Sequence, residues 1–583
     1  MISKIVCKCR YWLGFVAISI LSTACQTKID QEQGKADKIY YNAYIYPVTG
    51  NPLDYGAVAV VNGKIAAVGN SGEILDIWQH DSTLAIDCKG MFLMPGFIEG
   101  HGHLSSMGFN LIQLDLLATT SWQEIMDSVA SHAARVPKGT WITGRGWHQE
   151  KWNEAVQPNV DGYPYHDDLT SLTPEHPVMI VHASGHSLFA NKAAMDHAGI
   201  TGETPDPIGG KVIRDQQGRA IGVFEENAME LIRNAHKDYT ATLSQQALHA
   251  QWQAAIASAE EHCFAHGITS FHDAGASLLE IDRYHSMAKN DSLQLRVYCM
   301  LKQPYDEIKN RMSVLPIIGA GNDRFTCRTI KAYLDGALGS YGAWLLKPYL
   351  ERPDFTGQIT TTIEEIRQLA TLCVDHNLQM AVHAIGDKAN RTVLDIYEEM
   401  AGASGLNERR WRIEHAQHID TADIPRFKKL NVIASMQAVH CISDAPFVEK
   451  RIGYDRARYG AYAWRSLIDA GAHLANGTDT PVEKIDPFQN LYASVTRKRI
   501  DSGESFFPEQ AMTRAEAIKS YTINNAYAAF EENTKGSIEP GKWADLVLVS
   551  NNLLTCQEDS ILATKVLMTV VGGEVQYRGK TFH

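Results

Sequence analysis

The sequence lacks the cysteine patterns of a structural metal knuckle or a disulfide-stabilised fold. It has 10 cysteines in 583 residues, and no two of them form a Cys-x-x-Cys pair. Cys7, Cys9 and Cys25 lie near the N-terminus, and the other seven are scattered along the chain. This spacing argues against a structural zinc knuckle and predicts no disulfide. We therefore expect buried free thiols.

Internal membrane spans and a basic surface are also missing. Beyond the N-terminus, no apolar stretch approaches the length that a bilayer requires. The formal net charge is −13, which argues against nucleic acids and anionic lipid headgroups as partners. The chain is too long for one ordinary domain and can bury a large core.

Residues 1–24 have the layout of a secretory signal peptide, with basic residues, an apolar run and then small residues. Leu21-Ser22-Thr23-Ala24-Cys25 resembles a bacterial lipobox, although Leu21 lies one residue further from the cysteine than usual. We predict export from a bacterial cell, lipidation of Cys25 and a polar tether over 25–37. The protein would then be lipid-anchored in the envelope or periplasmic, with membrane contact only through the anchor. An ordinary cleaved signal is the alternative.

Both ends of the mature chain are rich in strand-forming segments. Residues 38–90 and 531–583 contain short strand-like runs joined by turns, including the hairpin signal Asn62-Gly63. We expect the two segments to form one small β-sandwich domain.

The middle of the chain, residues 91–530, alternates strand-like runs with amphipathic helices. Eight such strands predict an α/β fold, a (β/α)8 barrel of the TIM type. An open doubly wound sheet is the alternative, but the Gly-rich nucleotide turn that usually follows its first strand is missing. Residues 105–225 are too long for one crossover, so we predict an inserted subdomain after barrel strand 1, over the strand ends. The expected strands are 92–99, 268–273, 293–300, 328–334, 378–383, 411–415, 431–436 and 472–477.

Several of these strands end in residues that can bind a metal. In a barrel of this type the active site forms at the carboxyl ends of the strands. The first strand leads into His-x-His, and residues two apart in a strand project to the same side. Neutral imidazole is a common ligand of zinc and similar ions. The ordered series is His101, His103, Lys331, His383, His415 and Asp479.

This series resembles the metal-dependent amidohydrolase superfamily, and its details resemble the YtcJ-like branch (amidohydrolase family 3), which includes N-substituted formamide deformylase. The resemblance covers roughly residues 38–580. One departure is Gln437-Ala438-Val439-His440, where many relatives have Gln-Pro-x-His. The stretches that carry the resemblance are 94–103, 177–180, 185–186, 206–210, 331–339, 382–387, 413–415, 477–479 and 536–545.

The resemblance implies two divalent metals, with Zn²⁺ as the expected ion, bridged by a carboxylated Lys331. One ion would lie on His101 and His103, and the other on His383 and His415. Asp479 is the candidate catalytic base and a metal ligand, because a carboxylate must take the proton of the attacking water. Two alternatives stay open for Lys331. It could pair with Asp335 or Asp387, or the site could hold a single metal without it.

We therefore expect a hydrolase that cleaves a carbon–nitrogen bond outside peptide backbones, in an N-acyl, N-formyl or cyclic amide. A deaminase of the same superfamily and a non-catalytic small-molecule-binding lipoprotein are the alternatives. The partner would be a small-molecule amide substrate, with no nucleic acid, and the oligomeric state, a homodimer included, stays open. His186, His440 and Glu226 are further candidates for substrate binding.

Overall fold

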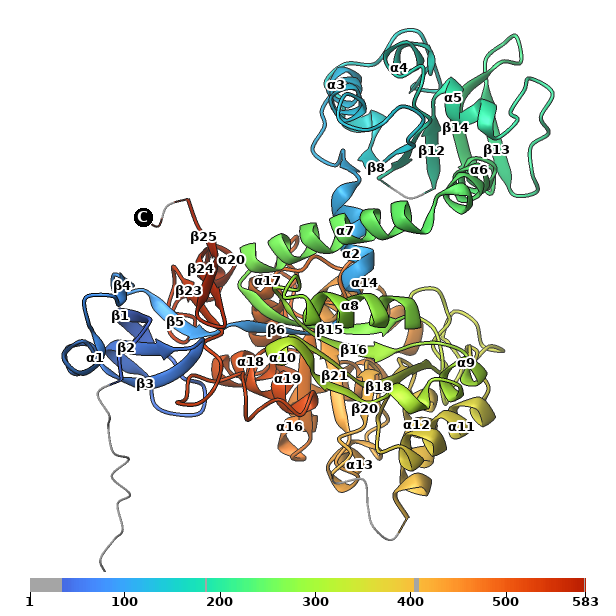
Figure 1. Cartoon of the computed structure of the whole chain (residues 1–583). Coiled ribbons are helices and arrows are strands. Elements are labelled where there is room, and N and C mark those ends of the chain that lie inside the picture. Colours follow the sequence, from blue (N-terminus) through green and yellow to red (C-terminus); the bar gives the residue numbers. More distant parts are fainter. Residues whose placement is uncertain (1–33, 184–185, 403–407, 581, 583) are drawn as a thin grey trace, which may run out of the picture.

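The computed structural model describes residues 34–183, 186–402, 408–580 and 582 (Figure 1). The predicted signal peptide, Cys25 and most of the tether lie outside the described residues. None of the helices within these ranges combines the length and the apolar character that crossing a bilayer would need.

An eight-stranded parallel sheet curves into a nearly closed barrel, as the sequence predicts. Its hydrogen-bonded order is β22-β21-β20-β19-β18-β16-β15-β6, with the short β17 (Ile317–Gly319) on β18. Consecutive strands are neighbours, which is the topology of repeated βα units. The barrel strands are β6 (Phe97–Gly102), β15 (Ile268–Ala276), β16 (Arg296–Leu301), β18 (Phe325–Tyr333), β19 (Gln379–Ala384), β20 (Arg412–His415), β21 (Ile433–Gln437) and β22 (His473–Gly477).

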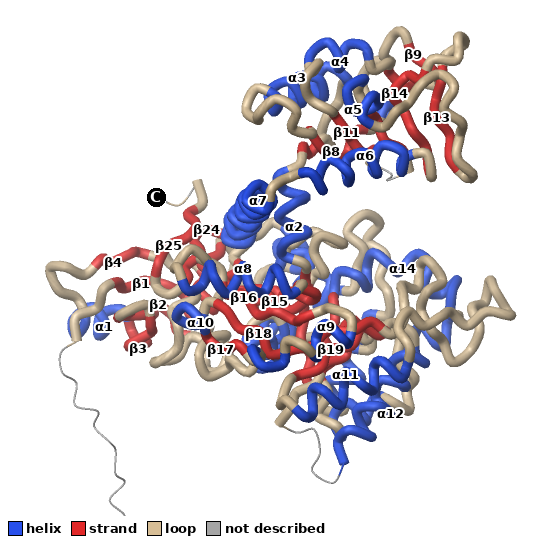
Figure 2. Tube along the Cα trace, turned by 45° about the vertical axis from the view of Figure 1, so that its right-hand side comes forward, coloured by secondary structure: helices blue, strands red, loops and turns tan. Residues whose placement is uncertain are grey.

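Helices follow the strands around the outside of the barrel (Figures 1 and 2). Two of these helices begin with a capping box, a motif that can be recognised in the sequence. Ser277 and Glu280 form it at the N-terminus of α8, and Thr513 and Glu516 form it at the N-terminus of α18. The helices that follow the barrel strands include α7 (Gln245–Ala265), α8 (Leu278–Lys289), α11 (Ile363–Asp375), α12 (Asp387–Ala401), α13 (Ile424–Lys429), α14 (Ala438–Ile452), α15 (Tyr454–Gly460), α16 (Trp464–Asp469), α17 (Pro487–Thr496), α18 (Arg514–Ser520) and α19 (Ile523–Ala528).

Side chains bridge the seam between the first and last barrel strands. Asn525 donates to the carbonyl oxygens of Ile98 at 2.6 Å and Asn476 at 2.7 Å, so one amide spans both strands. The buried Glu99 carboxylate accepts the Thr478 N–H at 2.6 Å. The strands can approach this closely because Gly477 has no side chain. A Cβ at this position would lie only 2.5 Å from the backbone nitrogen of His101. The seam thus positions the ends of the two strands that carry His101 and Asp479.

Strands from both ends of the chain share a second sheet. Its order is β25-β24-β23-β5-β1-β2-β3, and β4 pairs with β1. The structure divides the predicted strand 92–99, because residues 92–95 pair in this sheet and only the following residues enter the barrel. The strands are β1 (Lys38–Ile45), β2 (Leu53–Val61), β3 (Lys64–Asn70), β4 (Leu84–Asp87), β5 (Phe92–Pro95), β23 (Leu546–Val549), β24 (Val566–Val571) and β25 (Glu574–Arg578), with α1 (Ser71–Trp78) and α20 (Glu558–Leu562) beside them.

A third sheet forms a separate lobe, which α2 (Leu104–Ile112) and α7 connect to the barrel (Figures 1 and 2). The lobe stands off from the barrel, whereas we expected it over the strand ends. Its sheet order is β13-β14-β12-β11-β8-β7. Its elements are β7 (Leu114–Asp115), α3 (Trp122–Ala133), β8 (Ile142–Trp147), α4 (Asp167–Leu172), β11 (Val178–His182), β12 (Ser187–Ala190), α5 (Lys192–His197), β13 (Gly210–Arg214), β14 (Ala220–Glu226) and α6 (Met229–Thr242).

Candidate metal centre

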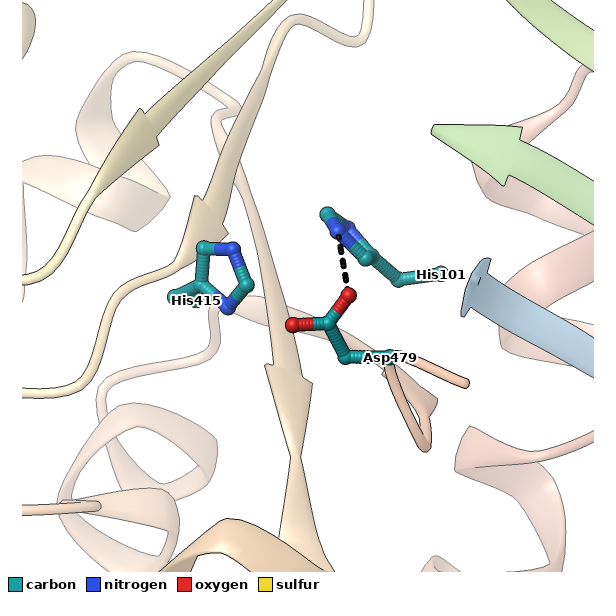
Figure 3. A group of neighbouring side chains, drawn as sticks. All are labelled: His101, His415 and Asp479. Atoms are coloured by element: carbon teal, nitrogen blue, oxygen red, sulfur yellow. Dashed lines mark ion pairs between the residues drawn. The ribbon is translucent and has the colours of Figure 1, made fainter. Parts of the chain in front are cut away.

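Three buried side chains meet at the carboxyl end of the barrel. His101 at the end of β6, His415 at the end of β20 and Asp479 after β22 offer ligand atoms that all lie within 4.8 Å of one another. In Figure 3 the two imidazoles face the Asp479 carboxylate from different strands. Three ligands at this spacing can bind one divalent ion and leave a position for water or substrate.

His103 and His383 border this group. His103 Nε2 lies 3.2 Å from Asp479 Oδ1. The His383 ring lies 4.4 Å from the His415 ring, centroid to centroid. The structure therefore brings together all four predicted histidines and Asp479.

Two of these residues have strained backbones. His415 has φ 74° and Asp479 has φ 59°, both in the left-handed region that non-glycine residues rarely adopt. The Asp479 N–H donates to the His101 carbonyl oxygen at 2.7 Å, so the seam supports this conformation. Backbone strain of this kind is concentrated at functional sites.

A buried carboxylate holds His101. Glu414 Oε2 lies 2.5 Å from His101 Nδ1, and Arg412 forms two hydrogen bonds to the same carboxylate. Burial alone would raise the pKa of Glu414, but the charge of Arg412 and the contact with His101 hold it well below its usual value. Because Glu414 is ionised, His101 Nδ1 donates the hydrogen bond and Nε2 is left with its lone pair. A carboxylate behind a histidine in this way is the usual support of a metal ligand.

Amide side chains set the tautomers of two further imidazoles. Gln437 donates through Nε2 to the Ser435 carbonyl oxygen, which turns Oε1 toward His415 Nδ1 at 2.7 Å. His415 Nδ1 therefore donates, and Nε2 is free to ligate. Gln417 Nε2 donates instead to His440 Nδ1 at 3.1 Å. His440 Nε2 consequently carries a hydrogen, which makes it a donor and not a ligand.

Lys331 lies under the same group of histidines. It is 1 % exposed, and its Nζ has no hydrogen-bond partner among the residues that the structure describes. Burial lowers its pKa to about 8, with Arg412 and Lys302 acting in the same direction. Asp335 accepts backbone N–H groups, as does Asp387, and neither forms an ion pair with the lysine. The structure thus does not contain the predicted alternative in which Lys331 pairs with one of these carboxylates.

Burial keeps the His101 and His383 imidazoles neutral. It lowers the pKa of His101 to about 4 and that of His383 to about 3, and the nearby Lys331 charge adds to both shifts. For Asp479, burial would raise the pKa, but His103, His101 and His415 together hold it well below its ordinary value. Neutral imidazoles beside an ionised carboxylate are the protonation states that a divalent metal requires.

The predicted substrate-binding residues are separated in space. His440 is buried on α14, and its ring stacks on His415 with centroids 6.2 Å apart. His186 and Glu226 lie on the inserted lobe, where they pair with each other at 3.1 Å and are 71 % and 58 % exposed. In this structure only His440 belongs to the metal centre, because the lobe that carries the other two stands off from the barrel (Figure 1).

Comparison with known proteins identifies the family. The model of the amidohydrolase family matches residues 84–577.

The chain belongs to this family.

Similar proteins agree with this assignment. The putative amidohydrolase YtcJ of Bacillus subtilis is 29% identical over 546 residues, which cover 92% of this chain and 99% of YtcJ. N-substituted formamide deformylase of Arthrobacter pascens is 26% identical over 569 residues, 93% of this chain and 98% of the deformylase. An uncharacterized metal-dependent hydrolase from Pyrococcus furiosus has a similar structure, with a TM-score of 0.70, 25% identity and coverage of 89% and 100%. This amidohydrolase is therefore a metal-dependent hydrolase that acts on carbon–nitrogen bonds.

The donor atoms of this amidohydrolase fit a metal. Buried polar atoms are normally hydrogen-bonded, since leaving one unpaired costs free energy. Here several buried atoms that have no hydrogen-bond partner lie close together in the described part of the chain: His101 Nε2, both ring nitrogens of His383, Lys331 Nζ and Asp479 Oδ1.

The sequence reasoning missed the residues that support the imidazoles. Arg412 and Glu414 stand two apart in a strand expected to be buried, and a charged pair there must be satisfied locally. That signal could have identified the pair. No comparable signal marked Gln417 and Gln437, because an amide after a strand has many structural uses.

Proposed function

We propose that this amidohydrolase cleaves an N-acyl, N-formyl or cyclic amide with two zinc-type ions bridged by a carboxylated Lys331. The observation that carries this proposal is that the ligand atoms of His101, His415 and Asp479 lie within 4.8 Å of one another, beside further buried nitrogens that have no hydrogen-bond partner among the described residues. A second support is the similarity to N-substituted formamide deformylase, since a formamide is an amide.

His101, His103, His383 and His415 would hold the ions, with Lys331 between them. An uncharged lysine amine can add carbon dioxide, and the carbamate offers two oxygens where the ammonium offers none. When bound, a divalent ion supplies a Lewis acid that lowers the pKa of water and polarises a carbonyl oxygen.

Asp479 has the position and charge of the general base. Its ionised carboxylate faces the imidazoles, 3.6 Å from His101 Nε2 (Figure 3). It takes a proton from water as the oxygen of that water bonds to the amide carbon. It then gives this proton to the nitrogen as the carbon–nitrogen bond breaks, so a carboxylic acid and an amine leave.

His440 is suited to stabilise the negative charge on the carbonyl oxygen. Gln417 occupies its Nδ1, so Nε2–H points away from that contact and has no partner within the described ranges. A preorganised donor of this kind acts where charge develops in the transition state. A neutral donor is also suitable beside cations, since it adds no charge to the site.

Metal analysis is the first experiment for this function. Protein that lacks residues 1–25, purified without chelator, is analysed for metal per chain. We expect close to two ions, and we expect Lys331→Ala to reduce both the metal content and the activity. A Lys331→Ala protein with two ions and full activity would contradict the bridge. Failure to bind any metal after supplementation would exclude the hydrolase and leave a binding protein.

An amide screen on the metal-loaded protein then tests the reaction. N-formyl amines, N-acyl amino acids and cyclic amides are assayed for amine release, and amino-heterocycles for ammonia. We expect amine release. Ammonia from the heterocycles alone would instead identify a deaminase.

Export and lipidation form a separate part of the proposal. The support is the signal-like segment that ends at Cys25. Mass spectrometry of the full-length protein expressed in a bacterium should find a diacylated Cys25 as the first residue. A mature protein that begins elsewhere, without lipid, would show an ordinary cleaved signal.

A further inference from the structure

We propose that Lys302 binds an anionic group of the substrate, so that the preferred amides carry a carboxylate, as N-acyl and N-formyl amino acids do. This inference rests on the proposed function, since it concerns the substrate of the same site.

Lys302 lies on the rim of the metal centre. Lys302 follows directly after β16. In the sheet, β15 lies between β16 and β6, and His103 follows the end of β6. The Lys302 N–H donates to the Ala276 carbonyl oxygen at 3.0 Å, which ties this position to the end of β15. The lysine is thus on the face of the barrel where the active sites of such folds lie.

An aromatic ring orients the Lys302 side chain toward the site. Its ammonium lies 4.2 Å from the centroid of the Tyr333 ring. The other neighbours of this ring belong to the metal centre: the His383 ring is 5.0 Å away and Lys331 Nζ is 4.8 Å away. One aromatic ring therefore separates the Lys302 charge from the proposed metal ligands.

A glycine keeps the space between Lys302 and His103 open. A Cβ on Gly275 of β15 would lie 3.6 Å from Lys302 Cδ and 3.7 Å from the His103 ring. Any longer side chain there would fill the gap between the cation and the imidazole. The glycine therefore leaves the gap between the lysine and the imidazole free of side-chain atoms of its own.

The Lys302 charge has no protein counterion. No ion pair between described residues includes it, and its side chain is exposed. Two acidic residues of the site are engaged elsewhere: Asp273 on β15 is buried beside the Tyr284 hydroxyl, and Asp479 faces the imidazoles. An ammonium at the mouth of the site is consequently free to pair with a carboxylate that the substrate supplies.

Matched substrates and variants test this role. Each N-formyl or N-acetyl amino acid is compared with the corresponding N-acyl amino alcohol, in which hydroxymethyl replaces the carboxylate. We expect the metal-loaded protein to favour the acid in kcat/KM by about tenfold, the size of one charged hydrogen bond at a partly wet site. Lys302→Gln should remove this preference mainly by raising KM for the acid, while Lys302→Arg should keep most of it.

Lys64→Gln is the matched control. Lys64 also places its ammonium over an aromatic ring, 5.0 Å from the Trp543 centroid, but it lies in the terminal sheet. Its loss should leave the acid-to-alcohol ratio unchanged. Raising the salt concentration should reduce the ratio of the unmodified protein, because an exposed ion pair is screened.

Three results would overturn the inference: equal rates for acid and alcohol in the unmodified protein, an unchanged ratio in Lys302→Gln, or a ratio that salt does not affect. If no amide is cleaved at all, the proposed function fails first. Calorimetric binding of N-formylmethionine and N-formylmethioninol to the metal-loaded protein and to Lys302→Gln then still decides whether Lys302 recognises the carboxylate.

Discussion

The barrel rim and the inserted lobe each place a histidine beside a glutamate, with opposite physical consequences. His101 and Glu414 are 1 % and 0 % exposed, and Arg412 holds the carboxylate from the other side. His186 and Glu226 are more than half exposed, on a lobe that stands off from the barrel. Burial and a third partner fix the protonation and direction of the first imidazole, whereas most of the second imidazole is exposed to solvent. A metal site needs the first arrangement, and residue type alone does not separate the two.

Loss of the proposed base should have the largest effect. Asp479→Asn retains the shape of the side chain but cannot take a proton, so kcat should fall by roughly 10²–10⁴-fold. Steady-state kinetics with metal content measured in parallel checks this. Glu226→Gln, the same change on the lobe, should leave kcat within about twofold. Equal losses in both variants would remove the distinction between the two regions.

His440→Ala should have the next largest effect. Without the Nε2–H donor, kcat should fall by about 10²–10³-fold, while the metal content stays at the level of the unmodified protein. Loss of metal together with activity would show that His440 ligates the metal, in contradiction to the tautomer that Gln417 imposes. His186→Ala provides the comparison on the lobe.

Glu414→Gln should weaken metal binding by about 10–100-fold, the usual effect of removing the carboxylate behind a ligating histidine. It also leaves Arg412 buried without its counterion, which should lower the free energy of unfolding by about 3–5 kcal/mol. Metal titration and denaturant unfolding measure the two effects. Should the protein be too unstable to isolate, Glu414→Asp keeps the charge and tests metal affinity alone.

The exposed pair on the lobe should have the smallest effect. His186→Ala should change the free energy of unfolding by less than about 0.5 kcal/mol, because exposed ion pairs contribute little. Metal affinity should not change. A rise in KM without a change in stability or metal content would show that the lobe meets the substrate.

Much of the barrel and its candidate ligands could be predicted from local patterns. The seven strand-like runs from 268 to 477 coincide with barrel strands to within a few residues, because period and length of apolar runs are local properties. The remaining predicted strand, 92–99, is divided in the structure, because its first half pairs with β1 and β23. Which sheet a buried strand joins depends on its neighbours in space, and no local pattern encodes them.

The inserted segment shows the same division between local and tertiary information. Its turn-rich composition was sufficient to predict a subdomain between the first strand and the next. The direction in which α2 and α7 carry the lobe away from the barrel was not predictable. The composition of a segment can predict that it folds separately, but the packing of the connecting helices decides where the segment lies.

By itself, the sequence determined that imidazoles, a lysine and a carboxylate stand at the ends of successive strands, since the strand period and the parallel order of βα units place them there. Only the tertiary structure decided which ring nitrogen of His101, His415 and His440 is occupied by a hydrogen bond. Glu414 and Gln437 turn Nε2 of His101 and His415 toward the metal position, and Gln417 makes His440 a donor. These contacts depend on the spacing between neighbouring strands and on the rotamers of buried side chains, which only the closed barrel fixes.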